Sequence, residues 1–103
     1  MNNKIISDKK INIMSKKWNK KKAILLAKEL NILLTKKHWQ VILIIKVFYK
    51  KYNIIPTTRM LLLSLKKEYK ILLTSQDLFI MFKSTPIKNL SKIAGLPEPK
   101  ICL

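Results

Sequence analysis

Apolar residues recur at helical spacing along most of this 103-residue chain, and that pattern limits its fold more than any other feature. From about residue 20 to residue 94 they stand three or four positions apart, which gives each segment one apolar face. The stretch 41–52 is rich in β-branched residues, but its length and its period favour a helix over a strand. The sequence therefore predicts a mainly α-helical protein, a small bundle of about five helices.

The limits of these helices are indicated by residues that begin or end helices. Thr and Ser side chains cap helix starts, Pro fits a first turn, and Asn or Gly accepts the left-handed conformation of a helix end. We expect starts at Thr35, at Thr57 or Thr58, at Ser75 and at Pro86, and ends at Asn31, Asn53 and Gly95. The side chains expected in the core are Ala23, Leu26, Ala27, Leu30, Val41, Ile44, Ile45, Phe48, Tyr52, Leu62, Leu65, Tyr69, Leu78, Met81, Phe82, Ile87, Leu90 and Ala94.

The two ends of the chain depart from the helical pattern. Near the start, Lys4–Ile6 and Ile11–Ile13 flank a polar tetrapeptide, which predicts a short N-terminal β-hairpin. Near the end, Pro97 and Pro99 favour extended polyproline geometry over a helix. We therefore expect a single domain over residues 1–103, in which residues 96–103 form a flexible C-terminal arm.

The charge of the chain is strongly positive, with a formal net charge of +17 from 22 basic and 5 acidic residues. One explanation is a nucleic-acid or acidic protein partner, toward which this charge would steer the chain. The other is base-composition drift, because all the basic residues except Arg59 are lysine and AT-rich codons encode lysine, isoleucine and asparagine. Both explanations stay open at this point.

Cys102, the only cysteine, is the strongest candidate for covalent chemistry. A single cysteine cannot form a disulfide within the chain, which agrees with a reducing, cytosolic location. The first ten residues lack the apolar segment of a signal peptide, and no apolar run approaches the ~20 residues that span a bilayer. Cys102 follows a proline-stiffened segment near a chain end, so its thiol is expected to be exposed, and its thiolate is the nucleophilic form.

Other residue types support weaker hypotheses. His38 could act as a catalytic base beside Cys102, but no orienting group or oxyanion hole is recognisable, and a packed position in a first helical turn is favoured. One cysteine and one histidine cannot fill a zinc site, so neither a metal nor a cofactor is expected. Arg59, the solitary arginine, could bind a carboxylate or stabilise a thiolate or persulfide anion with its guanidinium fork.

A helix-turn-helix arrangement of segments 35–52 and 57–69 offers an alternative function, a basic protein that binds nucleic acid. The second segment would be the recognition helix. Its sequence, TTRMLLLSLKKEY, has few polar side chains that could read base edges, so a packing role is favoured. Nucleic-acid binding is retained as the second hypothesis.

The C-terminal sequence KIAGLPEPKICL resembles the ending of the TusE/DsrC family of sulfur-relay proteins, which close on KIAGLPKP, two residues and a penultimate cysteine. Further matches in the same order are Trp18, Leu34–Thr35 with His38–Trp39, Tyr49, and Pro56 with Arg59. The resemblance covers roughly residues 18–103. It is specific, because several rare residue types recur in order.

This resemblance implies an α-helical fold with an N-terminal hairpin and a flexible arm that bears the active cysteine. DsrC proteins have a second cysteine where this chain has Ser91, eleven positions before Cys102, so the chain resembles the single-cysteine TusE branch. That branch implies a relay step in 2-thiolation of the tRNA wobble uridine. Cys102 would accept sulfur as a persulfide from a TusBCD-type complex and pass it to a tRNA 2-thiouridylase.

Overall fold

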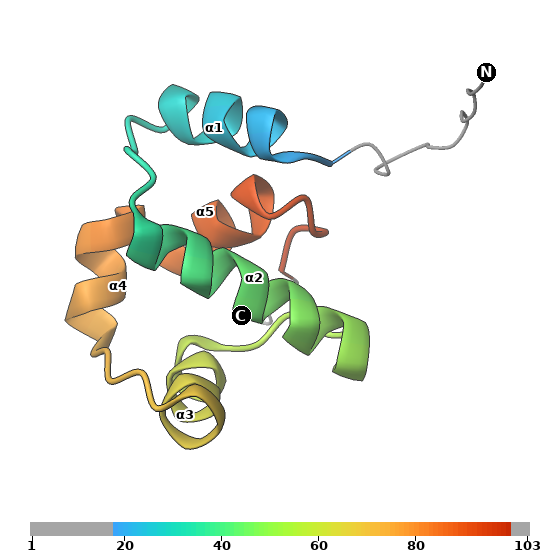
Figure 1. Cartoon of the computed structure of the whole chain (residues 1–103), viewed down its shortest axis with the longest axis vertical. Coiled ribbons are helices and arrows are strands. Elements are labelled where there is room, and N and C mark those ends of the chain that lie inside the picture. The colour runs from blue at the N-terminus through green and yellow to red at the C-terminus, as the bar shows by residue number, and fades with distance from the viewer. Residues whose placement is uncertain (1–17, 100–103) are drawn as a thin grey trace.

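Five α-helices make up the structure, a computed structural model that describes residues 18–99 (Figure 1). They are α1 (Lys20–Glu29), α2 (Lys36–Tyr52), α3 (Thr58–Tyr69), α4 (Ser75–Phe82) and α5 (Pro86–Ile93). Residues 18–99 contain no strand, and the mainly α-helical prediction is confirmed for this part. The predicted β-hairpin falls on residues 4–13, outside the described residues. None of α1–α5 has the length and the continuous hydrophobicity of a membrane-spanning helix.

The helix starts follow from side chains that satisfy the first free backbone amides. Thr35 and Thr57 are N-caps as predicted, and Pro86 occupies the first turn of α5. The prediction of Ser75 as a cap is wrong by one residue, because Thr74 is the N-cap of α4. The Thr74 hydroxyl accepts from the Asp77 amide at 3.1 Å, and the Asp77 carboxylate accepts from the Thr74 amide at 2.9 Å. This reciprocal pair makes Ser75 the first helical residue.

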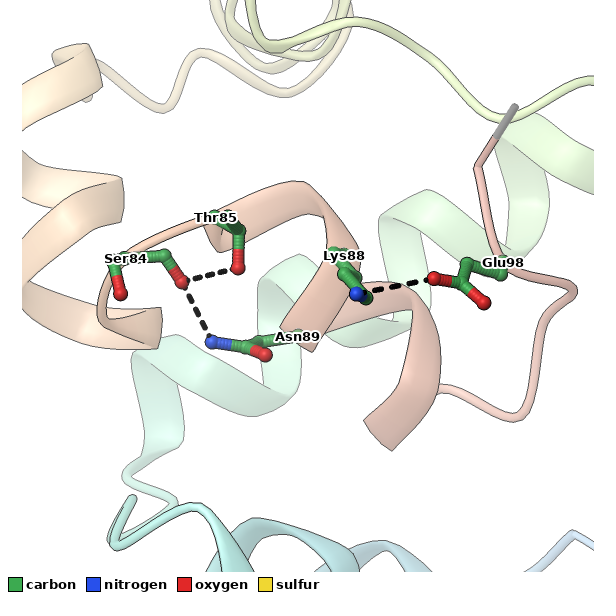
Figure 2. Close-up of polar contacts among 5 residues, drawn as sticks. All are labelled: Ser84, Thr85, Lys88, Asn89 and Glu98. Atoms are coloured by element: carbon green, nitrogen blue, oxygen red, sulfur yellow. Dashed lines mark hydrogen bonds and ion pairs between the residues drawn. The ribbon is translucent and has the colours of Figure 1, made fainter. Parts of the chain in front are cut away.

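The helix ends use the left-handed conformation, as expected for Asn31, Asn53 and Gly95. Lys70 ends α3 in the same conformation, although lysine gives no sequence signal for it. The sharp turn between α4 and α5 is held by Asn89, whose amide donates to the Phe82 carbonyl at 2.7 Å. The same amide donates to the Ser84 carbonyl at 2.9 Å (Figure 2).

The core forms around α5, which contacts α1, α2 and α4 (Figure 1). α3 lies at the far end of the molecule from α1 and contacts α4. The buried apolar side chains are Ala23, Ala27, Ile32, Val41, Ile42, Ile44, Ile45, Leu61, Leu65, Leu78, Phe82, Leu90, Ile93 and Ala94. Most of the predicted core positions are therefore confirmed.

Three predicted inward positions need correction. Tyr52 and Tyr69, at the ends of α2 and α3, are 49% and 38% exposed, since the bundle does not extend far enough to cover them. α3 buries Leu61 and Leu65, while Leu62 lies at the edge of the core. Ile42 is fully buried and was not predicted, because neighbouring elements cover a wider face of α2 than one stripe.

Candidate functional site: the base of the C-terminal arm

The arm that carries Cys102 leaves the bundle at the end of α5, and the structure describes it as far as Pro99. Cys102 itself lies outside the described residues. What the structure does show is how the base of the arm is held, and therefore where and in which direction the arm begins.

Gly95 turns the chain out of α5 through a Schellman motif. Its amide donates to the Lys92 carbonyl at 3.2 Å, and the Leu96 amide donates to the Ser91 carbonyl at 2.9 Å. The φ of Gly95 is +75°, which L side chains adopt only with strain. A Cβ at this position would also lie 2.5 Å from Cδ1 of Trp18. Both constraints require glycine here, and they fix the direction of the arm.

Trp18 closes over this turn from the other end of the described chain. Its indole Nε1 donates to the Ile93 carbonyl at 2.8 Å, across 75 residues of sequence. That carbonyl is among the last of α5, where no further amide of the helix is available to it. The tryptophan thus satisfies the helix end and packs on Gly95 with the same ring.

Lys46 of α2 also contacts the end of α5 and the Trp18 ring. Its Nζ donates to the Ala94 carbonyl at 3.3 Å and lies 3.9 Å from the centroid of the Trp18 ring. A cation suits this place, because the carbonyl end of a helix is negative and an aromatic face attracts positive charge. Burial lowers the pKa of Lys46 below its ordinary value of 10.5. We call Trp18, Lys46 and Gly95 the arm clamp.

Beyond the clamp, the described part of the arm contacts the body through Leu96 and Glu98. Leu96 is half-buried against the core. Glu98 pairs with Lys88 of α5 at 3.2 Å, and both side chains are largely exposed (Figure 2). An exposed pair of this kind stabilises by about 0–1 kcal/mol, so it can open at small cost.

His38 is a structural residue in this fold. It is buried, and its ring Nδ1 accepts from the Thr35 amide at 3.1 Å. Its Nε2 lies 2.9 Å from the Met81 carbonyl, which only accepts, so Nε2 carries the proton. The ring also packs edge-on against Phe82. Nδ1 thus caps the start of α2 and Nε2 joins α2 to α4, which confirms the packed position favoured from sequence.

Arg59 is exposed on α3 and belongs to a different part of the molecule. It lines a shallow groove of about 880 Å³ together with Leu63 and Lys66 of α3 and Leu72 of the following loop. Among residues 18–99, no hydrogen bond or ion pair joins it to the arm. Within the same range, no three His, Cys, Asp or Glu side chains gather as a metal site would require.

Comparison with known proteins agrees with this architecture. The family model described as "DsrC like protein" matches residues 2–103. The chain belongs to the DsrC-like family.

Members of the DsrC-like family with solved structures share the fold. The NMR structure of Allochromatium vinosum DsrC superposes with a TM-score of 0.74 at 32% identity, covering 84% of this chain and 78% of that one. The crystal structure of the oxidized gamma-subunit of the dissimilatory sulfite reductase (DsrC) from Archaeoglobus fulgidus gives 0.73 at 33% identity, covering 85% and 82%.

Similar sequences carry an activity in their names. "Sulfurtransferase TusE" of Buchnera aphidicola subsp. Acyrthosiphon pisum is 47% identical over 90 residues, or 86% of this chain and 79% of that protein. The protein of the same name from Photorhabdus laumondii is 41% identical over 90 residues, or 86% and 81%. The predicted activity is confirmed: this DsrC-like chain is a sulfurtransferase. The alternative of a helix-turn-helix nucleic-acid binder gains no support from these relatives.

Ser91 occupies the position at which the two-cysteine pattern has its second cysteine. Its side chain is fully buried in α5, and its hydroxyl has no hydrogen-bond partner among the described residues. An unpaired buried hydroxyl carries a desolvation cost of about 1–3 kcal/mol. The position thus holds a small side chain enclosed one turn before the arm, without the thiol that the two-cysteine pattern requires.

The arm clamp is the part of the site that sequence reasoning missed. Trp18 was noted only as a match to the family, and Lys46 was not singled out. Lys46 follows Ile42 by four positions, but the burial of Ile42 was itself not predicted, so no sequence signal pointed to Lys46. Nothing local identified its partner, the Ala94 carbonyl, 48 residues away.

Proposed function

We propose that this sulfurtransferase is the carrier of a sulfur relay for 2-thiolation of the tRNA wobble uridine, acting in the cytoplasm. Cys102 accepts sulfur as a persulfide from a TusBCD-type complex and passes it to a tRNA 2-thiouridylase. The observation that carries the proposal is the 47% identity, over most of both chains, to a protein named Sulfurtransferase TusE.

The chemistry is transfer of one sulfur atom between thiols. The Cys102 thiolate attacks the outer sulfur of the donor's persulfide, the donor S–S bond breaks, and the donor cysteine leaves as a thiolate. In the second step an acceptor thiolate attacks the outer sulfur of the Cys102 persulfide, and Cys102 leaves as a thiolate. Each step forms one S–S bond and breaks one, so no external oxidant or reductant is needed.

The reach of the arm depends on which of its contacts hold. Cys102 lies seven positions after Gly95, a span of at most about 23 Å when extended. If Glu98 stays paired with Lys88, only four residues remain, and the span falls to about 13 Å. Because the exposed pair opens at small cost, the arm clamp is the firm pivot, and residues 96–103 form the flexible part of the proposed carrier.

Arg59 keeps its predicted role as an anion-binding group for transfer. Its exposure on α3 leaves the guanidinium open to a carboxylate or to a persulfide anion of an arriving protein. In this proposal it acts when a partner is bound, because no described contact links it to the arm of the free chain.

Intact-mass spectrometry after incubation with a persulfide donor tests the carrier. We expect a gain of one sulfur atom, about 32 Da, that is labile to dithiothreitol and absent from Cys102→Ser. Persulfide on the serine variant, or no added sulfur on the native chain with a donor that loads other thiols, would contradict the proposal.

A further inference from the structure

The solvent face of α3 places exposed apolar side chains and cations around two shallow grooves. Leu63 stands at its centre, 49% exposed, as a ridge between two shallow grooves. One groove is the 880 Å³ groove with Arg59, and the other, of about 340 Å³, is lined by Tyr52, Ile54 and Met60. We call this region the α3 face.

Its apolar content exceeds what folding of this chain requires. Leu63 and Leu72 are 49% and 76% exposed, and Ile54 and Tyr52 lie half in solvent across the second groove. Contiguous apolar surface with a polar border is characteristic of protein interaction sites. On the border stand Arg59, Lys66 and Lys67 with one acid, Glu68.

The positive charge of the chain limits which molecules can bind the α3 face. A second copy of the chain would bring another net charge of +17 against this one, so self-association on the α3 face is opposed. The N-terminal residues 1–17 contribute five lysines and one aspartate and do not complement the border either. Nucleic acid would neutralise the cations but would leave Leu63 and Leu72 against phosphates.

We propose that the α3 face is the docking surface for an acidic protein surface with protruding apolar side chains, located on the sulfur-donating partner. This rests on the proposed function, which supplies the donor. A thiouridylase must present cationic surface to its tRNA, so less of its surface is free to be acidic. The donor has no such requirement. The occupant's apolar side chains fill the two grooves beside Leu63, and its carboxylates pair with Arg59, Lys66 and Lys67.

The test is binding of the purified donor complex to Leu63→Glu, measured by calorimetry in a Cys102→Ser background that permits docking without transfer. We expect the Kd to rise about tenfold or more, as for a central interface residue. Leu25→Glu is the matched control, because Leu25 is 58% exposed on α1 and the charge change is identical. Equal affinity of the two variants would overturn the proposal.

Lys66→Glu provides the second arm of the test, with Lys21→Glu on α1 as its control. We expect a several-fold weaker binding for Lys66→Glu and a shallower dependence on salt. Loss of binding to tRNA alone in Lys66→Glu, with unchanged binding of the donor complex, would assign the face to RNA and overturn the proposal. Circular dichroism of each variant confirms that it is folded.

Two further measurements distinguish a failure of the docking surface from a failure of the carrier function. If the donor docks through Leu63 but adds no sulfur to the native chain, the carrier function fails and the docking surface stands. A spin label on Cys102 tests whether residues 100–103 cover the face in the free chain. We expect the methyl signals of Leu63 to stay sharp, and strong broadening would overturn the assignment to a partner.

Discussion

The base of the arm and the α3 face differ in whether their side chains find partners within the folded chain. At the arm clamp, the polar atoms of Trp18 and Lys46 end on backbone carbonyls of the α5 terminus, drawn from segments far apart in sequence. On the α3 face, Leu63 and Leu72 remain in solvent, and among residues 18–99 no ion pair joins the cations around them to an acid. The contacts of the first region form when the chain folds, whereas those of the second form only when a partner binds.

This difference separates stability from function. A change at the arm clamp should lower the free energy of unfolding, because it breaks contacts that the folded chain already makes. A change on the α3 face should leave that free energy nearly unchanged and alter sulfur transfer, because its contacts form only with a partner.

Gly95→Ala should have the largest effect on stability. Alanine is strained at a φ of +75°, and its Cβ would overlap the Trp18 ring. We expect a loss of about 2 kcal/mol or more in the free energy of unfolding, measured by urea denaturation. Asn31→Ala is the control, since Asn31 also has a positive φ of 61° but is exposed. Equal losses at both positions would show that strain alone, and not the close approach of Trp18, distinguishes the clamp.

Trp18→Phe should have the next largest effect. It keeps an aromatic ring over Gly95 but removes the donor to the Ile93 carbonyl. We expect a loss of about 1 kcal/mol, or a fall of roughly 4–8 °C in Tm, by thermal denaturation. Trp39→Phe is the matched control, because the Trp39 ring is also half-buried but its indole has no described hydrogen bond. A smaller loss at position 18 than at position 39 would contradict the clamp.

Arg59→Lys tests the α3 face by preserving charge and removing the bidentate fork. We expect sulfur transfer from the donor to slow several-fold, while Tm changes by less than about 1–2 °C, in line with an exposed site. Equal transfer rates in the two proteins would make Arg59 an ordinary surface residue. A large fall in Tm would place it with the clamp instead and break the contrast between the regions.

Lys46→Met should have the smallest effect, seen in the dependence of stability on pH. Burial holds the pKa of Lys46 below 10.5, so between the lowered pKa and 10.5 the unfolded chain binds more protons than the folded chain. Stability from this group therefore rises with pH in that window, and the methionine variant should lack the rise. Urea midpoints at pH values from about 8 to 10 measure it. Lys50→Met, exposed on the same helix, should keep the native slope, and an unchanged slope in Lys46→Met would contradict the burial effect.

Local sequence signals were sufficient for most of the helices. Thr35, Thr57 and Gly95 act within one turn of their own positions, so their roles could be predicted without knowledge of the fold. The one misplaced start, Ser75, lies beside a reciprocal pair of Thr74 and Asp77 that was equally visible in the sequence but was not recognised.

The extent of burial was harder to predict, because it depends on where neighbouring helices stop. Tyr69 continues the apolar stripe of α3 yet is exposed. Leu63, six positions earlier in the same helix, is also exposed and forms a ridge on the surface. A periodic pattern shows that a helix has an apolar face, but it does not show whether another element covers that face.

The sequence by itself determined the helical class, most helix limits, and the family to which the motif around Gly95 and Cys102 points. These depend on interactions between residues close in the chain, or on residue types in a recognisable order. Only the tertiary structure decided that Trp18 and Lys46 meet at the end of α5 and that Leu63 is left uncovered. The physical reason is that a backbone carbonyl carries no sequence signature, so contacts with it across 75 and 48 residues appear only when the chain has folded.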